Sequence, residues 1–237
     1  RPDAAAASIL EGNIIILVDN SPSAMILPTT LIAITEEAND YYFPPVTGTY
    51  LRLSRMLITL MSLLVTPLFL LFMEHPQWIP GTLSFIAIED PVHIPLIWQF
   101  LMLELSIDGL RLAAIHTPDV LSTPLSVIAG LSIGEFSVES GWFNSEVLLY
   151  MAFVTIANYS QINMELNYAL KFMRILLLLL TNWFGLPGFM LGLLGIFFSL
   201  LTCRTFSGKG YLYPFIPFDW KLLKRYLFRM KLKEPGN

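Results

Sequence analysis

Residues 175–203 read ILLLLLTNWFGLPGFMLGLLGIFFSLLTC, a run of 29 residues without a charged side chain. A membrane-spanning helix needs about 20 such residues. The segment Thr181–Pro187 interrupts the run with Asn, Gly and Pro, which favour turns. We therefore predict a tight helical hairpin rather than one long helix. Basic residues flank the run on both sides: Lys171, Arg174, Arg204 and Lys209. Because basic residues mark cytoplasmic ends, both ends of the hairpin are predicted to face the cytoplasm.

Within this hairpin, Gly188 and Gly192 form a G-x-x-x-G pattern. Small residues at this spacing let another helix approach closely, so we interpret them as helix-packing positions. The alternative is that glycines are simply frequent in membrane helices.

A second apolar segment, Met56–Met73, has 18 residues without a charge. At about 1.5 Å per residue it is roughly 27 Å long, close to the hydrocarbon thickness of a bilayer. Arg52 and Arg55 precede it, and Glu74 follows it. The segment is therefore predicted to be the first spanning helix, with its N-terminal end in the cytoplasm.

The composition agrees with a membrane protein. Of the 237 residues, 55% are hydrophobic and 14% are charged, whereas soluble domains have about 25% charged residues. The single cysteine excludes an internal disulfide, and the three histidines lack the spacing of zinc ligands. We predict no metal and no cofactor. A soluble enzyme and a nucleic-acid binder are both disfavoured.

One enzyme-like motif occurs at residues 130–134, which read GLSIG and match the G-x-S-x-G of serine hydrolases. The catalytic histidine of that class follows the serine in the chain, but no histidine follows His116. We interpret Ser132 as a small residue at a helix contact, and the chain is not predicted to be an enzyme.

Three less apolar segments lie between the two strong ones: Leu96–Ile115, Leu125–Val138 and Val147–Tyr159. If all three span, the chain has six membrane helices; if the first two only re-enter, it has four. The predicted fold is an all-α polytopic membrane bundle of four to six helices. Both chain ends are then cytoplasmic.

The segment Leu96–Ile115 carries Glu104, Asp108 and Arg111 at spacings that place them on one helical face. Three charges cost about 9 kcal/mol to insert into a bilayer, while the apolar residues return only about 5 kcal/mol. The polar stripe must therefore face partners or water. With Glu135, it forms a predicted ion path in which the excess of acid favours cations. The alternative is that Arg111 pairs with Asp108 or Glu104 to lock helices together.

The two ends of the chain are more polar. Asn13–Val18 and Ala24–Leu27 are predicted strands joined by a turn. We expect residues 1–45 to be the end of a small cytoplasmic α/β domain with its linker, 46–210 the membrane domain and 211–237 a cytoplasmic tail. Basic residues of this tail lie along an amphipathic helix suited to an anionic membrane surface: Lys221, Lys224, Arg225 and Arg229. Nucleic-acid phosphate is the disfavoured alternative.

Several short motifs are distributed along the whole chain. They are Arg1–Asp3, Leu10–Gly12, Ile16–Asp19, Asp40–Tyr42, Tyr50–Arg52, Glu104–Arg111, Ile133–Gly134, Val138–Glu139, Arg204–Phe206 and Tyr211–Phe215. Together they resemble the A-subunit family of spore germinant receptors, the GerA family. The chain departs from that family in having Glu135 where Gln is frequent and in lacking prolines in Tyr159–Met164.

This resemblance implies a subunit of an oligomeric complex in the spore inner membrane that takes part in ion release at germination. The implied partners are the lipid bilayer, further copies of the chain and other germination membrane proteins. It also implies a larger cytoplasmic N-terminal region, of which residues 1–45 are the end. A non-conducting scaffold that assembles receptor complexes is the alternative function.

Overall fold

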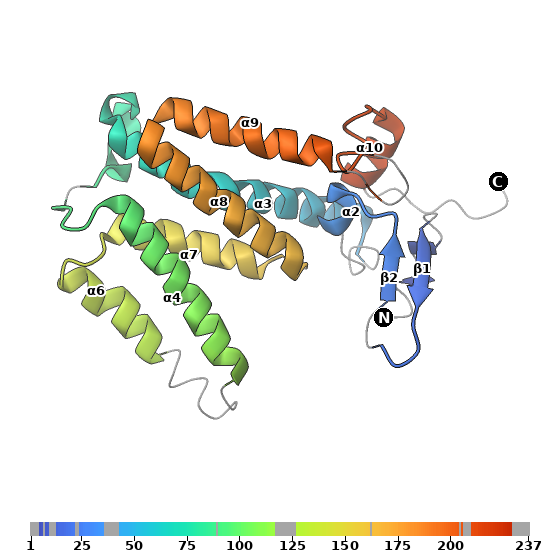
Figure 1. Cartoon of the computed structure of the whole chain (residues 1–237), viewed down its shortest axis with the longest axis horizontal. Helices are drawn as coiled ribbons and strands as arrows, with labels where there is room; N and C mark the ends of the chain where they lie inside the picture. Colours follow the sequence, from blue (N-terminus) through green and yellow to red (C-terminus); the bar gives the residue numbers. More distant parts are fainter. Residues whose placement is uncertain are drawn as a thin grey trace. The chain divides into compact units, whose positions relative to one another are not determined.

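The computed structural model describes residues 5–6, 8–9, 13–21, 24–35, 43–88, 90–116, 127–161, 163–203, 205 and 210–228. It divides into two compact units, which are described separately. The first comprises residues 1–58, 161–166 and 194–237, and the second comprises residues 59–160 and 167–193. Helices predominate in the described part of the chain (Figure 1).

The longest helix is α3, Pro45–Glu74, which contains 30 residues. It begins with proline, whose fixed φ suits the first turn of a helix. In the described part of the chain, α3 is the helix that is long and apolar enough to cross a membrane. The predicted segment Met56–Met73 lies inside it. The helix starts before the apolar run. Residues 46–55 contain no proline that would break a helix, so they extend it toward the N-terminus.

The 29-residue apolar run forms two helices, as predicted, but the first helix begins well before the run. Helix α8 covers Met164–Phe184 and α9 covers Leu186–Thr202. Between them, Gly185 adopts φ +61°, a left-handed conformation that glycine adopts without steric cost and that commonly ends helices. Lys171 and Arg174, expected as flanking residues, therefore lie inside α8.

Helices α8 and α9 approach closely at the two glycines of the G-x-x-x-G pattern. A Cβ atom on Gly188 would clash with the backbone carbonyl of Leu180 on α8. A Cβ atom on Gly192 would lie 2.6 Å from the side chain of Leu177. The absence of side chains at both positions thus permits the observed helix packing.

Two further helices match predicted segments: α4 covers Leu96–His116 and α7 covers Ser145–Tyr159. Of the predicted segment 125–138, residues 125 and 126 lie outside the described residues. The remainder is helical but contains a π-helix, η4, at Gly130–Glu135, followed by α6 at Phe136–Glu139. Short 3-10 helices, η2 (Pro76–Trp78) and η3 (Gly81–Ile86), precede α4.

The core of the second unit lies where α3, α4, α7 and α8 meet. Its buried residues are Phe69, Leu70, Ile97, Phe100, Leu103, Phe143, Val147, Met151 and Leu178. The rings of Phe69 and Phe100 pack edge to face with centroids 6.1 Å apart. This core fixes α4 against α7 and so determines the direction in which the polar residues of α4 point.

A buried amide pair connects the start of α4 to the start of α7. The side-chain nitrogen of Gln99 donates to Asn144 Oδ1 at 2.8 Å and to the carbonyl of Ile94 at 2.8 Å. The backbone N–H of Asn144 donates to Gln99 Oε1 at 2.9 Å. Asn144 directly precedes α7, so the pair satisfies polar groups at that helix end.

We expect Gln99→Leu to lower the free energy of unfolding by about 1–3 kcal/mol, because it leaves the buried Asn144 groups without partners. The measurement is the thermal unfolding midpoint of the whole protein in lipid nanodiscs. Gln77→Leu, at an exposed glutamine of η2, is the matched control and should change the midpoint little. Equal midpoints for the two variants would show that the amide pair has no stabilising role.

The first unit contains a β-hairpin and short helices. Strand β1, Ile14–Leu17, pairs antiparallel with β2, Ala24–Leu27, so that Ile14 faces Leu27. This agrees with the two predicted strands. Helix α2 covers Leu31–Thr35, and its first N–H donates to the carbonyl of Tyr211 at 3.1 Å.

Helix α10, Trp220–Leu227, is the described part of the predicted amphipathic tail. Leu223 is buried within the first unit and Lys224 is exposed, as expected for such a helix. Arg229 lies outside the described residues, as do the side chains of Lys221 and Arg225.

Candidate functional site

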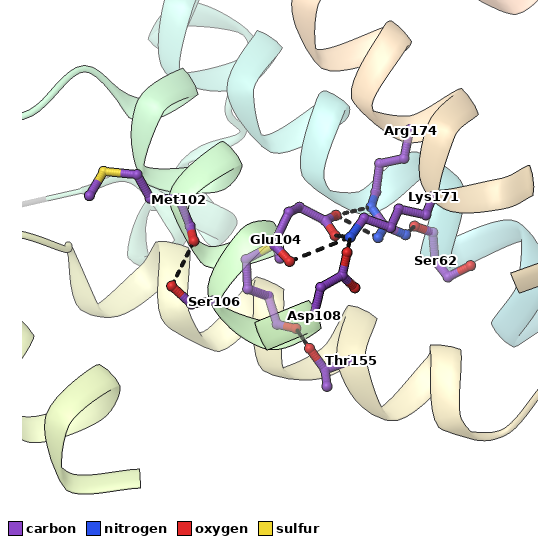
Figure 2. Close-up of polar contacts among 9 residues, drawn as sticks. Ser62, Met102, Glu104, Ser106, Asp108, Thr155, Lys171 and Arg174 are labelled. Carbon is purple, nitrogen blue, oxygen red and sulfur yellow. Dashed lines mark hydrogen bonds and ion pairs between the residues drawn. The ribbon is translucent and has the colours of Figure 1, made fainter. Parts of the chain in front are cut away.

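Four charged side chains form a cluster between α4 and α8 (Figure 2), which we call the buried cluster because Glu104, Lys171 and Arg174 are buried in it, while Asp108 is partly exposed. Arg174 donates from Nε to Glu104 Oε1 at 2.7 Å and from Nη1 to the carbonyl of Ser62 on α3 at 2.9 Å. Lys171 forms an ion pair with Asp108, and its Nζ lies 3.6 Å from Glu104 Oε2. The cluster therefore connects three helices of the second unit.

Helical spacing explains why these residues meet. Glu104 and Asp108 are four residues apart on α4, and Lys171 and Arg174 are three residues apart on α8. Both spacings place side chains on one face, one turn apart. The two carboxylates of α4 therefore face the two cations of α8 at matching positions along the helices.

The cluster is balanced, because its two acids and two bases have a net charge of zero. Arg174 is fully buried and Glu104 is 4% exposed. Removing such charges from water is costly, and only close, hydrogen-bonded pairing offsets that cost. The carboxylates of Glu104 and Asp108 are consequently compensated within the chain. This arrangement is better suited to fixing α4 against α8 and α3 than to binding a free cation.

Apolar side chains occupy the outward face of α4, which is adjacent to its charged face. Leu105 is 74% exposed, although its neighbour Glu104 is buried. Large apolar side chains are also exposed on α4, α7 and α8: Trp98, Leu112, Leu149, Ile156, Phe172, Leu176 and Trp183. Charges inside and apolar groups outside are the distribution expected of helices in a lipid environment.

Arg111 occupies a different site from the other members of the predicted stripe. Its guanidinium carbon lies 5.0 Å from the ring centroid of Tyr159 and 5.8 Å from that of Tyr168. These are cation–π distances. The structure does not show the alternative pairing of Arg111 with Asp108 or Glu104. Those two carboxylates pair instead with Lys171 and Arg174 of α8.

The fourth predicted residue, Glu135, ends the π-helix η4 and is exposed. The structure does not bring it into the cluster. The G-x-S-x-G motif also lies in η4, whereas a nucleophile elbow joins a strand to a helix. Among the described residues there is no group of three or more His, Cys, Asp or Glu that can hold a metal ion.

Sequence reasoning missed Lys171 and Arg174 as members of the site. It treated them as flanking charges because the charge-free run starts directly after Arg174. A signal was present: residues 164–170 contain no proline or glycine, so a helix can begin well before the run. The matching i, i+3 and i, i+4 spacings of opposite charge were a second signal.

Comparison with known proteins gives a match along nearly the whole chain. Residues 1–235 match the family described as Bacillus/Clostridium GerA spore germination protein. The chain is 38% identical to stage V sporulation protein AF of Bacillus subtilis (strain 168) over 97% of this chain and 46% of that protein. It is 27% identical to spore germination protein KA of the same strain, over 97% of this chain and 43% of that protein.

A third relative is the uncharacterized membrane protein YfkQ of Bacillus subtilis (strain 168), with 27% identity over 92% of this chain and 44% of that protein. The chain therefore spans slightly less than half the length of these curated relatives. No solved structure matches it.

Proposed function

The chain belongs to the GerA family of spore germination proteins, and from this we propose that it is the membrane part of a germination-complex subunit that contributes to cation release across the spore inner membrane. The observation that carries the membrane placement is the burial of charged side chains together with the exposure of large apolar ones in the second unit. Charged groups are buried between helices there, and large apolar side chains are exposed. The relative YfkQ is itself named a membrane protein.

In this proposal the helices form a polytopic bundle with both chain ends in the cytoplasm. Residues 1–45 are the end of a cytoplasmic domain, 46–210 the membrane domain and 211–237 a tail whose basic helix lies on the anionic membrane surface. Helices α4 and α8, with 21 residues each, are about 31 Å long, enough to cross the hydrocarbon core. Further copies of the chain and other germination membrane proteins are the proposed partners.

The buried cluster and Glu135 have different parts in this proposal. Glu104 and Asp108 hold α4 against α8 and α3, so they support the ion path rather than line it. Glu135 is exposed, and among the described residues no cation pairs with it. It is thus the predicted site residue with a carboxylate available to a passing cation.

We expect Glu135→Gln to reduce potassium efflux from vesicles that contain the whole reconstituted protein, without changing its thermal unfolding midpoint. Neutralising a carboxylate beside an ion path lowers the local cation concentration. Asp90→Asn, at an exposed loop carboxylate, is the matched control and should leave efflux unchanged. If Glu135→Gln and Asp90→Asn conduct like the original protein, Glu135 has no role in conduction.

A non-conducting scaffold is the second candidate, and the charge balance of the cluster favours it. Paired charges between helices stabilise a bundle without providing a path for ions. For a scaffold, Arg174→Met should abolish co-purification with other germination membrane proteins, while reconstituted vesicles containing the original protein should show no potassium efflux above that of empty vesicles.

A further inference from the structure

An apolar groove of about 580 Å³ lies between α4, η4 and α7 in the second unit. This volume is within the roughly 300–1,000 Å³ typical of ligand-binding clefts. Small residues give the groove its depth, namely Ala114, Ala129, Gly130, Gly134 and Ala152. Leu103 and Leu148 line one part of it, and Tyr159 lines the end of α7. The groove thus follows the helices and is apolar along its length.

Arg111 lies beside the Tyr159 end of this groove. Its neighbours Leu110 and Ala114 line the groove, and its guanidinium is placed over the Tyr159 ring. In the part of the chain that the structure describes, the contacts of this guanidinium are with Tyr159 and Tyr168 and not with a carboxylate. Unlike Lys171 and Arg174, Arg111 therefore keeps an uncompensated positive charge.

An apolar groove with one free cation at its end matches an amphiphile that has an apolar chain and an anionic head. We infer that this groove binds an acyl chain of an anionic phospholipid, whose phosphate contacts Arg111. Arginine binds phosphate strongly through charge-assisted hydrogen bonds, and tyrosines are frequent at the level of lipid headgroups. The inference rests on the membrane placement proposed above.

The proposed topology places this headgroup site on the appropriate side of the membrane. Arg111 lies near the C-terminal end of α4, Tyr159 ends α7, and Tyr168 lies near the start of α8. With the N-terminal end of α3 in the cytoplasm, and with α3, α4, the segment 125–138 and α7 each spanning the membrane once, these three ends face the cytoplasm. Basic residues on that side meet an anionic lipid surface.

The test is native mass spectrometry of the whole protein, purified in detergent and titrated with phosphatidylglycerol or phosphatidylcholine. The original protein should retain phosphatidylglycerol in preference to phosphatidylcholine. Arg111→Gln should weaken phosphatidylglycerol binding about tenfold, because a charge-assisted hydrogen bond is lost. Ala152→Phe should reduce the binding of both lipids by filling the groove.

Two control variants separate this site from general effects. Gln77→Glu lowers the net charge by one, as Arg111→Gln does, at an exposed residue of η2, and Leu149→Phe enlarges an exposed apolar residue of α7; neither residue lines the groove. Both variants should bind phosphatidylglycerol like the original protein. If Gln77→Glu weakens binding as much as Arg111→Gln, the lipid responds to net charge and the proposed site is wrong.

Other occupants give other results. In one case, inorganic phosphate displaces phosphatidylglycerol while Ala152→Phe still binds that lipid. This result would show a headgroup site without the groove and would overturn the proposal. Loss of oligomers in Ala152→Phe with unchanged lipid binding would assign the groove to a second copy. If the protein is recovered without membranes or detergent, the membrane placement itself fails. Recovery in membranes with no lipid preference rejects this inference alone.

Discussion

Replacing Arg174 with methionine is expected to lower the free energy of unfolding by about 3–5 kcal/mol, because the substitution leaves Glu104 buried without its main partner. Arg174 is fully buried and contacts both Glu104 and the carbonyl of Ser62, so its loss affects α3, α4 and α8 together. The measurement is the thermal unfolding midpoint of the whole protein in lipid nanodiscs.

Arg111→Met is the matched control for this variant. It removes the same group from helix α4 but leaves no buried carboxylate behind, since Arg111 contacts two tyrosine rings. It should cost about 1 kcal/mol, the value of two partly exposed cation–π contacts. Equal destabilisation by the two variants would mean that the buried cluster contributes no more than surface contacts.

The second large effect is expected for Gly188→Ala. The added methyl group would collide with the backbone carbonyl of Leu180 and would lie 2.8 Å from Cβ of Phe184. Since a backbone cannot move aside as a flexible side chain does, α9 must separate from α8. Overpacking of this kind costs typically 1–3 kcal/mol and sometimes more.

Gly195→Ala tests whether the effect comes from packing or from helix propensity. Gly195 is in the same helix, and no described atom lies within 4 Å of a Cβ built there. Alanine favours helices over glycine by about 1 kcal/mol, so this control should be neutral or stabilising. If Gly188→Ala also raises the unfolding midpoint, the close approach of α8 and α9 at this glycine is wrong.

Much of the helical architecture could be predicted because it depends on local sequence signals. The apolar runs identified α3 and the α8–α9 pair, and Gly185 marked the break between the latter two. The boundaries were less predictable. Helix α8 extends back to Met164 because propensity and tertiary packing continue a helix beyond its apolar part.

The candidate site was only half predictable, for a physical reason. The spacing of Glu104 and Asp108 showed that they share a face of one helix, but spacing along a helix does not tell which other helix that face meets. The pairing with Lys171 and Arg174 depends on the packing of α4 against α8. Lys171 is 63 positions from Asp108 in the sequence, and Arg174 is 70 positions from Glu104. For the same reason Arg111 was expected beside the carboxylates and is found on Tyr159 and Tyr168.

We conclude that Glu104 of α4 and Arg174 of α8 stabilise each other inside the second unit. A double-mutant cycle with Glu104→Met, Arg174→Met and the combined variant measures this directly from unfolding free energies. The combined variant should be more stable than the sum of the single effects predicts, with a coupling energy of about 2–3 kcal/mol for a contacting pair. Single effects that add to within about 0.5 kcal/mol, the behaviour of distant sites, would contradict the claim.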